Sequence, residues 1–280
     1  MAVQDNVLDR MIAQDELPKK WPWYLTFSLF GIVFFLVWMA VARPWTMYVT
    51  WIVTMITLAA FVLIAGKGIT NFWRGAFIDD RNKISLSRFQ MIIWSIVVLA
   101  AYGTMAIGRA TVDPVMALNI DIPNTLLMLM GISTTSLIAS PLIRNTRTVD
   151  AAVLNNEEQA TQPIHEVIDE DTGIIENRRS PVVANASKRQ AKWADLFMGE
   201  EVGNKKHLDL AKIQMFFFTV LLVLAYAVSL GFMMRADELP AAFPVIGDGM
   251  LLLMGISHTG YLSNKAVPKT KKRLEDQEMA

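Results

Sequence analysis

Six long stretches without a charged residue constrain the fold of this chain more than any other feature of its sequence. Five of them hold 20 to 23 residues between their flanking charges, and the sixth, between Asp248 and Lys265, holds 16. An α-helix rises about 1.5 Å per residue, so roughly 20 residues cross the ~30 Å hydrocarbon core of a bilayer. The sixth stretch is short and polar, but an internal repeat pairs it with a full-length one. We therefore expect an all-α polytopic membrane protein with six transmembrane helices and short interfacial helices.

The charge-free stretches also divide the chain into parts. We expect a cytoplasmic N-terminal segment at 1–22, a first transmembrane hairpin at 23–66, a first repeat unit at 67–142, a cytoplasmic polar loop at 143–187, a second repeat unit at 188–266 and a basic cytoplasmic tail at 267–280. Within the loop, 155–162 is expected to be unstructured, and 165–169 and 174–177 are expected to pair as a small hairpin. A connection this long is typical of either disorder or a partner-docking segment.

Composition excludes several classes of protein. The chain carries 26 Lys and Arg against 26 Asp and Glu, has no Cys and is 53% hydrophobic. This composition is not that of a nucleic-acid binder driven by bulk positive charge, a disordered acidic chain or a cysteine zinc protein. The chain also lacks HExxH, GxSxG, P-loop and glycine-rich dinucleotide motifs. We expect no enzyme activity, no catalytic residue, no cofactor, no metal and no nucleic-acid partner.

Basic residues fall on one side of this topology. With the N-terminus in the cytoplasm, 23 of the 26 Lys and Arg lie in cytoplasmic segments, and only Arg43, Arg109 and Arg235 lie in outer turns. Cytoplasmic loops of membrane proteins carry such an excess. The pattern predicts an integral protein of a bacterial inner (plasma) membrane with both termini in the cytoplasm. Its partners would include the bilayer and the anionic lipids of the inner leaflet.

Spans three and four recur as spans five and six. A shift of 124 residues superposes 129–133 on 253–257, both reading Leu-Met-Gly-Ile-Ser, and carries the outer loop along without a gap. Upstream, a shift of 120 aligns Trp73 and Phe77 with Trp193 and Phe197. Each unit holds an even number of spans, so the copies point the same way. We interpret this as a parallel tandem duplication of a helical hairpin.

Small and hydroxylated residues recur on the returning span of each unit. Close backbone approach and interhelical hydrogen bonds join helices within lipid, so these residues indicate either helix packing or the lining of a narrow polar path. They are Gly131, Ser133 and Thr135 in the first unit and Gly255, Ser257 and Thr259 in the second.

Three polar side chains are predicted to lie inside the membrane. Gln90 and Gln214 are expected to bond a hydroxyl or a carbonyl of a neighbouring helix, because a buried amide needs partners. His258 is the one plausibly ionisable side chain within a span, and an intramembrane histidine is a candidate for a proton or ligand role. Against that role, the first unit has Thr134 at the equivalent position, and no acidic partner lies within the membrane.

Aromatic residues precede each unit. In 188–201, Trp193, Leu196 and Phe197 follow helical spacing beside basic residues, which predicts an interfacial helix on the inner leaflet. Trp73 and Phe77 indicate the same for the first unit.

Two functions fit these features. The first is a non-enzymatic anchor or scaffold that joins a larger assembly through its cytoplasmic loop and termini. The alternative is an oligomeric channel or facilitator whose Gly-Ile-Ser helices line the path. In either case we expect a homo-oligomer or a protein complex.

Overall fold

The computed structural model describes residues 22–42, 45–154, 166–169, 174–177, 183–185, 187–201, 204–236 and 238–267. The predicted N-terminal segment up to residue 21, the segment 155–162 and the basic tail from residue 268 lie outside the described residues.

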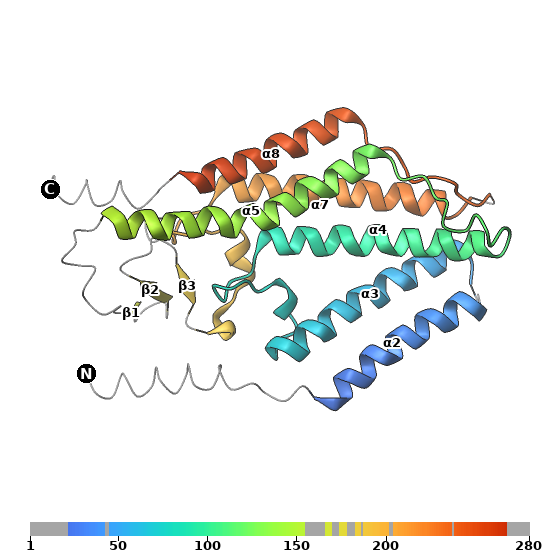
Figure 1. The fold of residues 1–280 in the computed structure, drawn as a ribbon, viewed down its shortest axis with the longest axis horizontal. Helices are drawn as coiled ribbons and strands as arrows, with labels where there is room; N and C mark the ends of the chain where they lie inside the picture. The colour runs from blue at the N-terminus through green and yellow to red at the C-terminus, as the bar shows by residue number, and fades with distance from the viewer. Residues whose placement is uncertain are drawn as a thin grey trace.

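Six α-helices dominate the described part of the chain and lie side by side along one long axis (Figure 1). α4 packs against α3, α5 and α7, α8 packs against α5 and α7, and α2 lies against α3 at the edge. Their bounds are α2 (Trp23–Ala42), α3 (Met47–Thr70), α4 (Leu86–Ala110), α5 (Asn124–Leu154), α7 (Leu210–Met233) and α8 (Asp248–Ala266). Three short 3₁₀ helices, η1 (Gly75–Phe77), η2 (Lys188–Gln190) and η3 (Trp193–Leu196), lie in the connections.

Five of the described helices, α2, α3, α4, α5 and α7, are long and apolar enough to cross a membrane. Large apolar side chains cover their outward faces, which is the surface that lipid requires; Phe34 is 73% exposed and Phe217 is 64% exposed. The helical, apolar fold is compatible with an integral membrane protein. α8 is not among the five, because its 19 residues include both polar and charged side chains.

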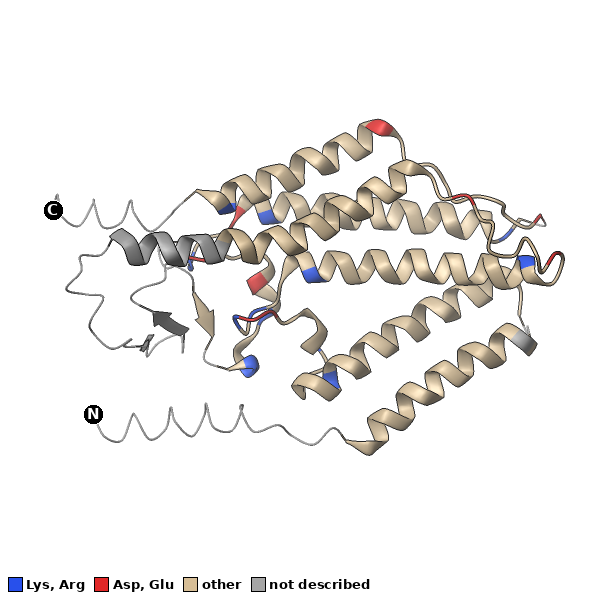
Figure 2. Ribbon diagram, in the orientation of Figure 1, with Lys and Arg blue, Asp and Glu red and all other residues tan. Residues whose placement is uncertain are grey.

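Successive described helices run in opposite directions, so their ends gather at two ends of the bundle (Figure 1). At one end, which we call the elbow end, α3, α5 and α8 finish and α4 and α7 begin. Two segments fold there: elbow A, residues 71–85, and elbow B, whose described residues are 187–201 and 204–209. Figure 2 places most of the described Lys and Arg at this end. Arg109, in the last turn of α4, and Arg235, just after α7, lie at the opposite end.

Large side chains fill the interior between α4, α5, α7 and α8. In lipid there is little hydrophobic drive between helices, so dense packing of such side chains holds the helices together. The largest of them are at most 1% exposed: Trp94, Met105, Leu126, Leu129, Met215, Leu230 and Met254.

The connections differ from the prediction in two places. The segment 188–201 forms two 3₁₀ turns instead of one interfacial helix, because the carboxylate of Asp195 accepts the backbone N–H of Lys192 at 2.8 Å and bends the chain. Trp193 is consequently 51% exposed whereas Leu196 is buried, so the apolar residues do not share one face. α5 also extends to Leu154, well into the predicted loop at 143–187.

The small hairpin predicted in the loop is confirmed. β1 (Glu166–Asp169) and β2 (Ile174–Asn177) pair antiparallel. A third strand, β3 (Ala184–Asn185), adds to β2 and leads into elbow B.

Elbow A fits against the end of α3 through two glycines. A Cβ added at Gly66 would lie 2.6 Å from the backbone nitrogen of Ala76, and one added at Gly75 would overlap the side chain of Thr70 and the carbonyl oxygen of Gly66. The chain therefore crosses itself at a distance that only glycine allows.

We expect Gly66→Ala to lower the free energy of unfolding by about 1–3 kcal/mol, because backbone must move to admit the methyl group. Thermal unfolding in detergent measures this. Gly103→Ala is the matched control: a Cβ at Gly103, within α4, meets nothing within 4 Å. Alanine there is expected to be neutral or stabilising, and equal destabilisation by both changes would contradict the close approach.

Candidate functional site

A carboxylate at the elbow end, Glu200, holds cations from three other segments. It lies 3.0 Å from Nζ of Lys212 in the first turn of α7 and 2.6 Å from Nζ of Lys265 in the last turn of α8. Nη1 of Arg81 in elbow A lies 3.3 Å from it. All four side chains are at most 12% exposed. We call these four residues the Glu200 cluster.

Electrostatics keep this carboxylate ionised. Burial alone would raise the pKa of Glu200, because desolvation disfavours the charged form. The attraction of Arg81, Lys212 and Lys265 outweighs burial and holds the pKa well below its ordinary value of 4.5. Removing one partner of a buried ion pair typically costs about 3–5 kcal/mol. The Glu200 cluster therefore joins segments that are distant in the sequence, and loss of one partner would leave buried charge uncompensated.

Arg81 is positioned from the opposite side by Asp79. Nε and Nη2 of Arg81 donate to Oδ2 of Asp79 at 3.0 and 2.7 Å, and Oδ1 accepts the backbone N–H groups of Arg81 and Lys83. Burial would lower the pKa of Arg81, but Glu200 and Asp79 raise it overall. Asp79 thus stabilises the turn of elbow A and orients the guanidinium group of Arg81 toward Glu200.

Direct hydrogen bonds also join elbow A to the second half of the chain. Asn82 adopts a left-handed φ of 56°. Its side-chain amide donates to the backbone carbonyl of Asn185 at 2.9 Å, and the side-chain amide of Asn185 donates to the backbone carbonyl of Asn82 at 2.8 Å. The backbone N–H of Ile84 donates to Asp195 of η3 at 3.3 Å. The two elbows therefore form one ordered layer at this end of the bundle.

Buried polar side chains continue from the Glu200 cluster into the bundle along the contact between α5 and α8. Nζ of Lys265 donates to Oη of Tyr261 at 3.0 Å and also to the hydroxyl of Ser140. Deeper in, Oγ of Ser136 lies 2.5 Å from Nδ1 of His258. We call this row the α5–α8 seam; its members are Ser133, Ser136, Ser140, Ser257, His258 and Tyr261, each at most 5% exposed.

Several polar atoms of the seam have no hydrogen-bond partner among the described residues. They are Oγ of Ser133, Oγ of Ser257 and Nε2 of His258. Buried polar groups are normally paired, with protein or with water. The seam therefore has hydrogen-bonding capacity that a polar guest could satisfy.

The two glutamines occupy different environments. Nε2 of Gln90, on α4, donates to the hydroxyl of Thr219 and, at 3.4 Å, to the carbonyl of Met215, both on α7. Gln214 lies on the exposed face of α7 instead of in a contact between helices, which corrects the expectation of a buried partner for it. The difference arises because α4 is covered by three helices whereas that face of α7 is open.

The small residues of the returning spans divide in the same way. Ser133 and Ser257 face the interior, whereas Gly131, Thr135 and Thr259 are exposed and Gly255 is half-buried. A Cβ added at Gly131 or Gly255 would meet nothing within 4 Å. Within one chain, these glycines therefore do not mediate the close helix approach that their spacing suggested.

The aromatic residues of the elbows split between surface and interior. Trp73 and Trp193 are 57% and 51% exposed. Phe77 and Phe197 are half-buried in a small apolar cluster beneath the elbows, and the rings of Phe77 and Trp193 lie 5.6 Å apart. The pair of elbows thus presents tryptophans outward and holds phenylalanines inward.

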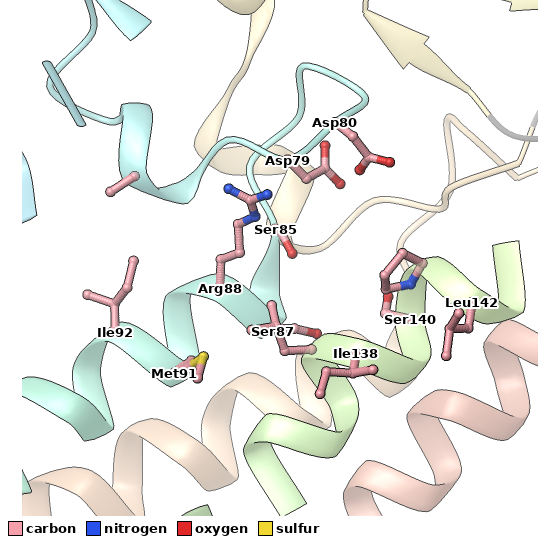
Figure 3. Close-up of a pocket in the computed structure, with 13 residues that line it drawn as sticks. Asp79, Asp80, Ser85, Ser87, Arg88, Met91, Ile92, Ile138, Ser140 and Leu142 are labelled. Atoms are coloured by element: carbon pink, nitrogen blue, oxygen red, sulfur yellow. The ribbon is translucent and has the colours of Figure 1, made fainter. Parts of the chain in front are cut away.

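A pocket of about 570 Å³ opens between elbow A, the start of α4 and residues 137–142 of α5 (Figure 3). Its walls combine polar and charged side chains of elbow A and α4 with apolar side chains of α4 and α5. The polar members are Asp79, Asp80, Ser85, Ser87, Arg88 and Ser140; the apolar members include Met91, Ile92, Leu137, Ile138 and Leu142.

Within the described part of the chain, no group of three or more His, Cys, Asp and Glu side chains is placed to hold a metal ion. Comparison of this chain with known protein families, with curated proteins and with solved structures finds no match in any of the three.

Sequence reasoning did not find the Glu200 cluster. Glu200 lies in a polar connection, and its partners flank predicted spans, where basic residues are expected anyway. One signal was present: counting by the repeat, Glu200 and Lys212 correspond to Asp80 and Arg88, so both elbows carry an acid followed by a base. Such a pair at equivalent positions favours an ion pair over an isolated surface charge.

We expect Glu200→Gln to lower the free energy of unfolding by about 3–5 kcal/mol, because three cations lose a buried counter-charge. The depressed pKa of Glu200 means that its contribution is present above pH 4.5 and is lost as pH falls further toward the folded-state pKa. Unfolding in detergent between pH 3 and 7 should therefore show a weaker acid dependence in the variant.

The matched control is Glu238→Gln, at an exposed carboxylate at the opposite end of the bundle. It should leave both the stability and its pH dependence unchanged. Identical curves for Glu200→Gln and the control would show that the Glu200 cluster does not stabilise the fold.

Proposed function

We propose that the protein is a non-enzymatic membrane anchor that serves as a scaffold for a larger assembly at its elbow end. The observation that carries this proposal is the Glu200 cluster. Its three cations surround one carboxylate and tie both elbows, α7 and α8 into one layer, which would give a docking platform a rigid base. The packed interior between α4, α5, α7 and α8 also favours an anchor over a wide pore.

The proposed topology has six spans with the elbow end in the cytoplasm of a bacterial cell. In support, α8 packs against both α5 and α7, so it completes the bundle despite its polar character (Figure 1). Most described basic residues lie at the elbow end (Figure 2), as the cytoplasmic side requires. Trp73 and Trp193, exposed at this end, are suited to the interface and to anionic lipid beside them.

The proposal includes a duplication of the hairpin, α4–α5 giving α7–α8. In support, α4 and α7 begin 124 residues apart, and so do α5 and α8. Each elbow is closed by an antiparallel bridge at corresponding positions, Ile78 with Ile84 and Met198 with Leu208. Corresponding backbone hydrogen bonds follow, Ser85 to Phe77 at 2.9 Å and Asp209 to Phe197 at 2.8 Å.

A scaffold needs a segment that the partner recognises, and the loop between the halves is the proposed one. A photo-crosslinking residue at exposed position 189 in η2, beside the loop and outside the segment replaced below, should capture a specific protein in cells. Replacing 155–182 with a flexible linker should abolish recovery of that protein, while the bundle keeps its thermal stability because α5 and β3 remain.

The control is a chain with 155–182 scrambled, which preserves length and composition. It should lose the partner as well, since recognition depends on sequence. Recovery of the same protein from all three chains, or of none from the native chain, would count against the scaffold.

A facilitator for protons or small polar solutes is the second candidate, and the unpartnered atoms of the α5–α8 seam favour it. Ser133 and Ser257 occupy equivalent positions in the two units, and His258 lies beside Ser257. Oligomer formation through the exposed faces that carry Gly131 and Gly255 is part of either proposal.

For this candidate, purified protein in vesicles should pass protons or glycerol, followed with an internal pH-sensitive dye and by osmotic swelling. Ser133→Leu and Ser257→Leu should reduce the flux at least tenfold, because each fills polar space in the seam with an isobutyl group. Ser263→Leu, on the exposed face of α8, is the control and should leave flux unchanged. Flux equal in all variants would exclude the seam as the path.

A further inference from the structure

The pocket beside elbow A is the first-unit counterpart of the Glu200 cluster. Asp80 and Glu200 are each the second residue after the bridge residue of their elbow, Ile78 or Met198. Arg88 and Lys212 are each the third residue of their helix, α4 or α7. Asp80 and Arg88 both line the pocket (Figure 3).

The two sites differ at the third position. The residue equivalent to Lys265, 124 residues earlier, is Pro141, and it also lines the pocket. In the second unit the ammonium group of Lys265 lies 2.6 Å from Glu200. In the first unit the residue at this position is a proline, which carries no amine, and it borders a pocket. The pocket therefore has space where the second unit has the ammonium group of Lys265.

The lining offers acceptors that suit an amine. Oγ of Ser87 is buried, with the residue 1% exposed, and has no hydrogen-bond partner among the described residues. Pro141 has no N–H, so the carbonyl of Leu137, one turn earlier in α5, lacks its helical donor. Asp80, Ser87 and Leu137 all line the pocket, so its lining includes a carboxylate, a hydroxyl and a carbonyl, the kinds of acceptor that the three N–H donors of an ammonium group require.

The rest of the pocket suits a phosphate and an acyl chain. Arg88 is exposed at the start of α4 and provides a guanidinium, the group that binds phosphate most specifically. Met91 and Ile92 form an apolar wall, and Ile138 and Leu142, 56% and 58% exposed, continue it on the outward face of α5. The charged groups lie toward elbow A, and the apolar surface runs along α4 and α5. This order matches the head group and the acyl chains of a lipid at a membrane interface.

We propose that this pocket binds one phospholipid with a primary-amine head group, of the phosphatidylethanolamine class. Its ammonium takes the place that Lys265 occupies in the second unit, its phosphate pairs with Arg88, and its chains follow Met91, Ile92 and Ile138. The comparison of the two units uses the proposed duplication, whereas the scaffold plays no part in it. The loop replacement that tests the scaffold leaves every residue of the pocket in place.

The test is a lipid titration of the full chain in non-ionic detergent, with bound lipid counted by native mass spectrometry. Phosphatidylethanolamine should bind at one per chain and at least tenfold more tightly than phosphatidylcholine, which has the same charge but no N–H donor. Phosphatidylglycerol and free phosphoethanolamine, which lack the amine and the chains respectively, should also bind more weakly. Equal affinity for the ethanolamine and choline lipids, or tighter binding of the glycerol lipid, would overturn the proposal.

Three variants localise the site. Asp80→Asn and Arg88→Gln should each weaken ethanolamine-lipid binding about tenfold, the loss expected for one charge-assisted contact. Pro141→Lys should abolish the preference for ethanolamine over choline, because it supplies the ammonium from the chain itself. Arg109→Gln, at the other end of α4, is the control and should change nothing.

Thermal unfolding of each variant in lipid-free detergent verifies that it folds. Binding that is unchanged in Asp80→Asn and Arg88→Gln, in chains that fold, would place the lipid elsewhere and contradict the assignment. Preserved selectivity in folded Pro141→Lys would contradict the equivalence with Lys265.

Discussion

The buried carboxylate of Glu200 is the constraint on which the elbow end of the bundle depends. Its three cations come from elbow A, α7 and α8, which are separated by long stretches of sequence. A lone buried charge is costly, whereas a fully paired set is tolerated. The cluster is therefore complete only when both hairpins are docked in one register. The polar seam between α5 and α8 begins at Lys265 of this cluster, and the asparagine contacts join the same two elbows.

The helices were predictable because hydropathy is a local property of the sequence. A stretch of 20 uncharged apolar residues predicts a helix wherever it occurs, and the structure has helices at all six stretches. Helix ends were less predictable. α5 continues past Arg144 because charge alone does not stop a helix, and the sequence from there to Leu154 contains neither glycine nor proline. Elbow B departed from its helical spacing because the carboxylate of Asp195 binds backbone N–H groups.

The candidate site was harder to predict because it is built from non-local pairs. Which glutamine becomes buried depends on how many helices cover each face, and Gln90 and Gln214 look identical in sequence. The same holds for Glu200, since a carboxylate in a polar loop is normally solvated. The repeat was the one sequence feature with information about pairing, because it set Asp80 and Arg88 beside Glu200 and Lys212 as equivalents.

The two ends of the bundle have different mechanical character. At the elbow end, ion pairs and hydrogen bonds link the hairpins. At the opposite end the backbone link between them is a single short parallel bridge, in which Asp121 exchanges hydrogen bonds with Ala241 and Phe243 at 3.0 and 2.9 Å. Among the described residues, fewer polar bonds therefore join the hairpins at that end than at the elbow end, and a force that separates the helices would meet less resistance there.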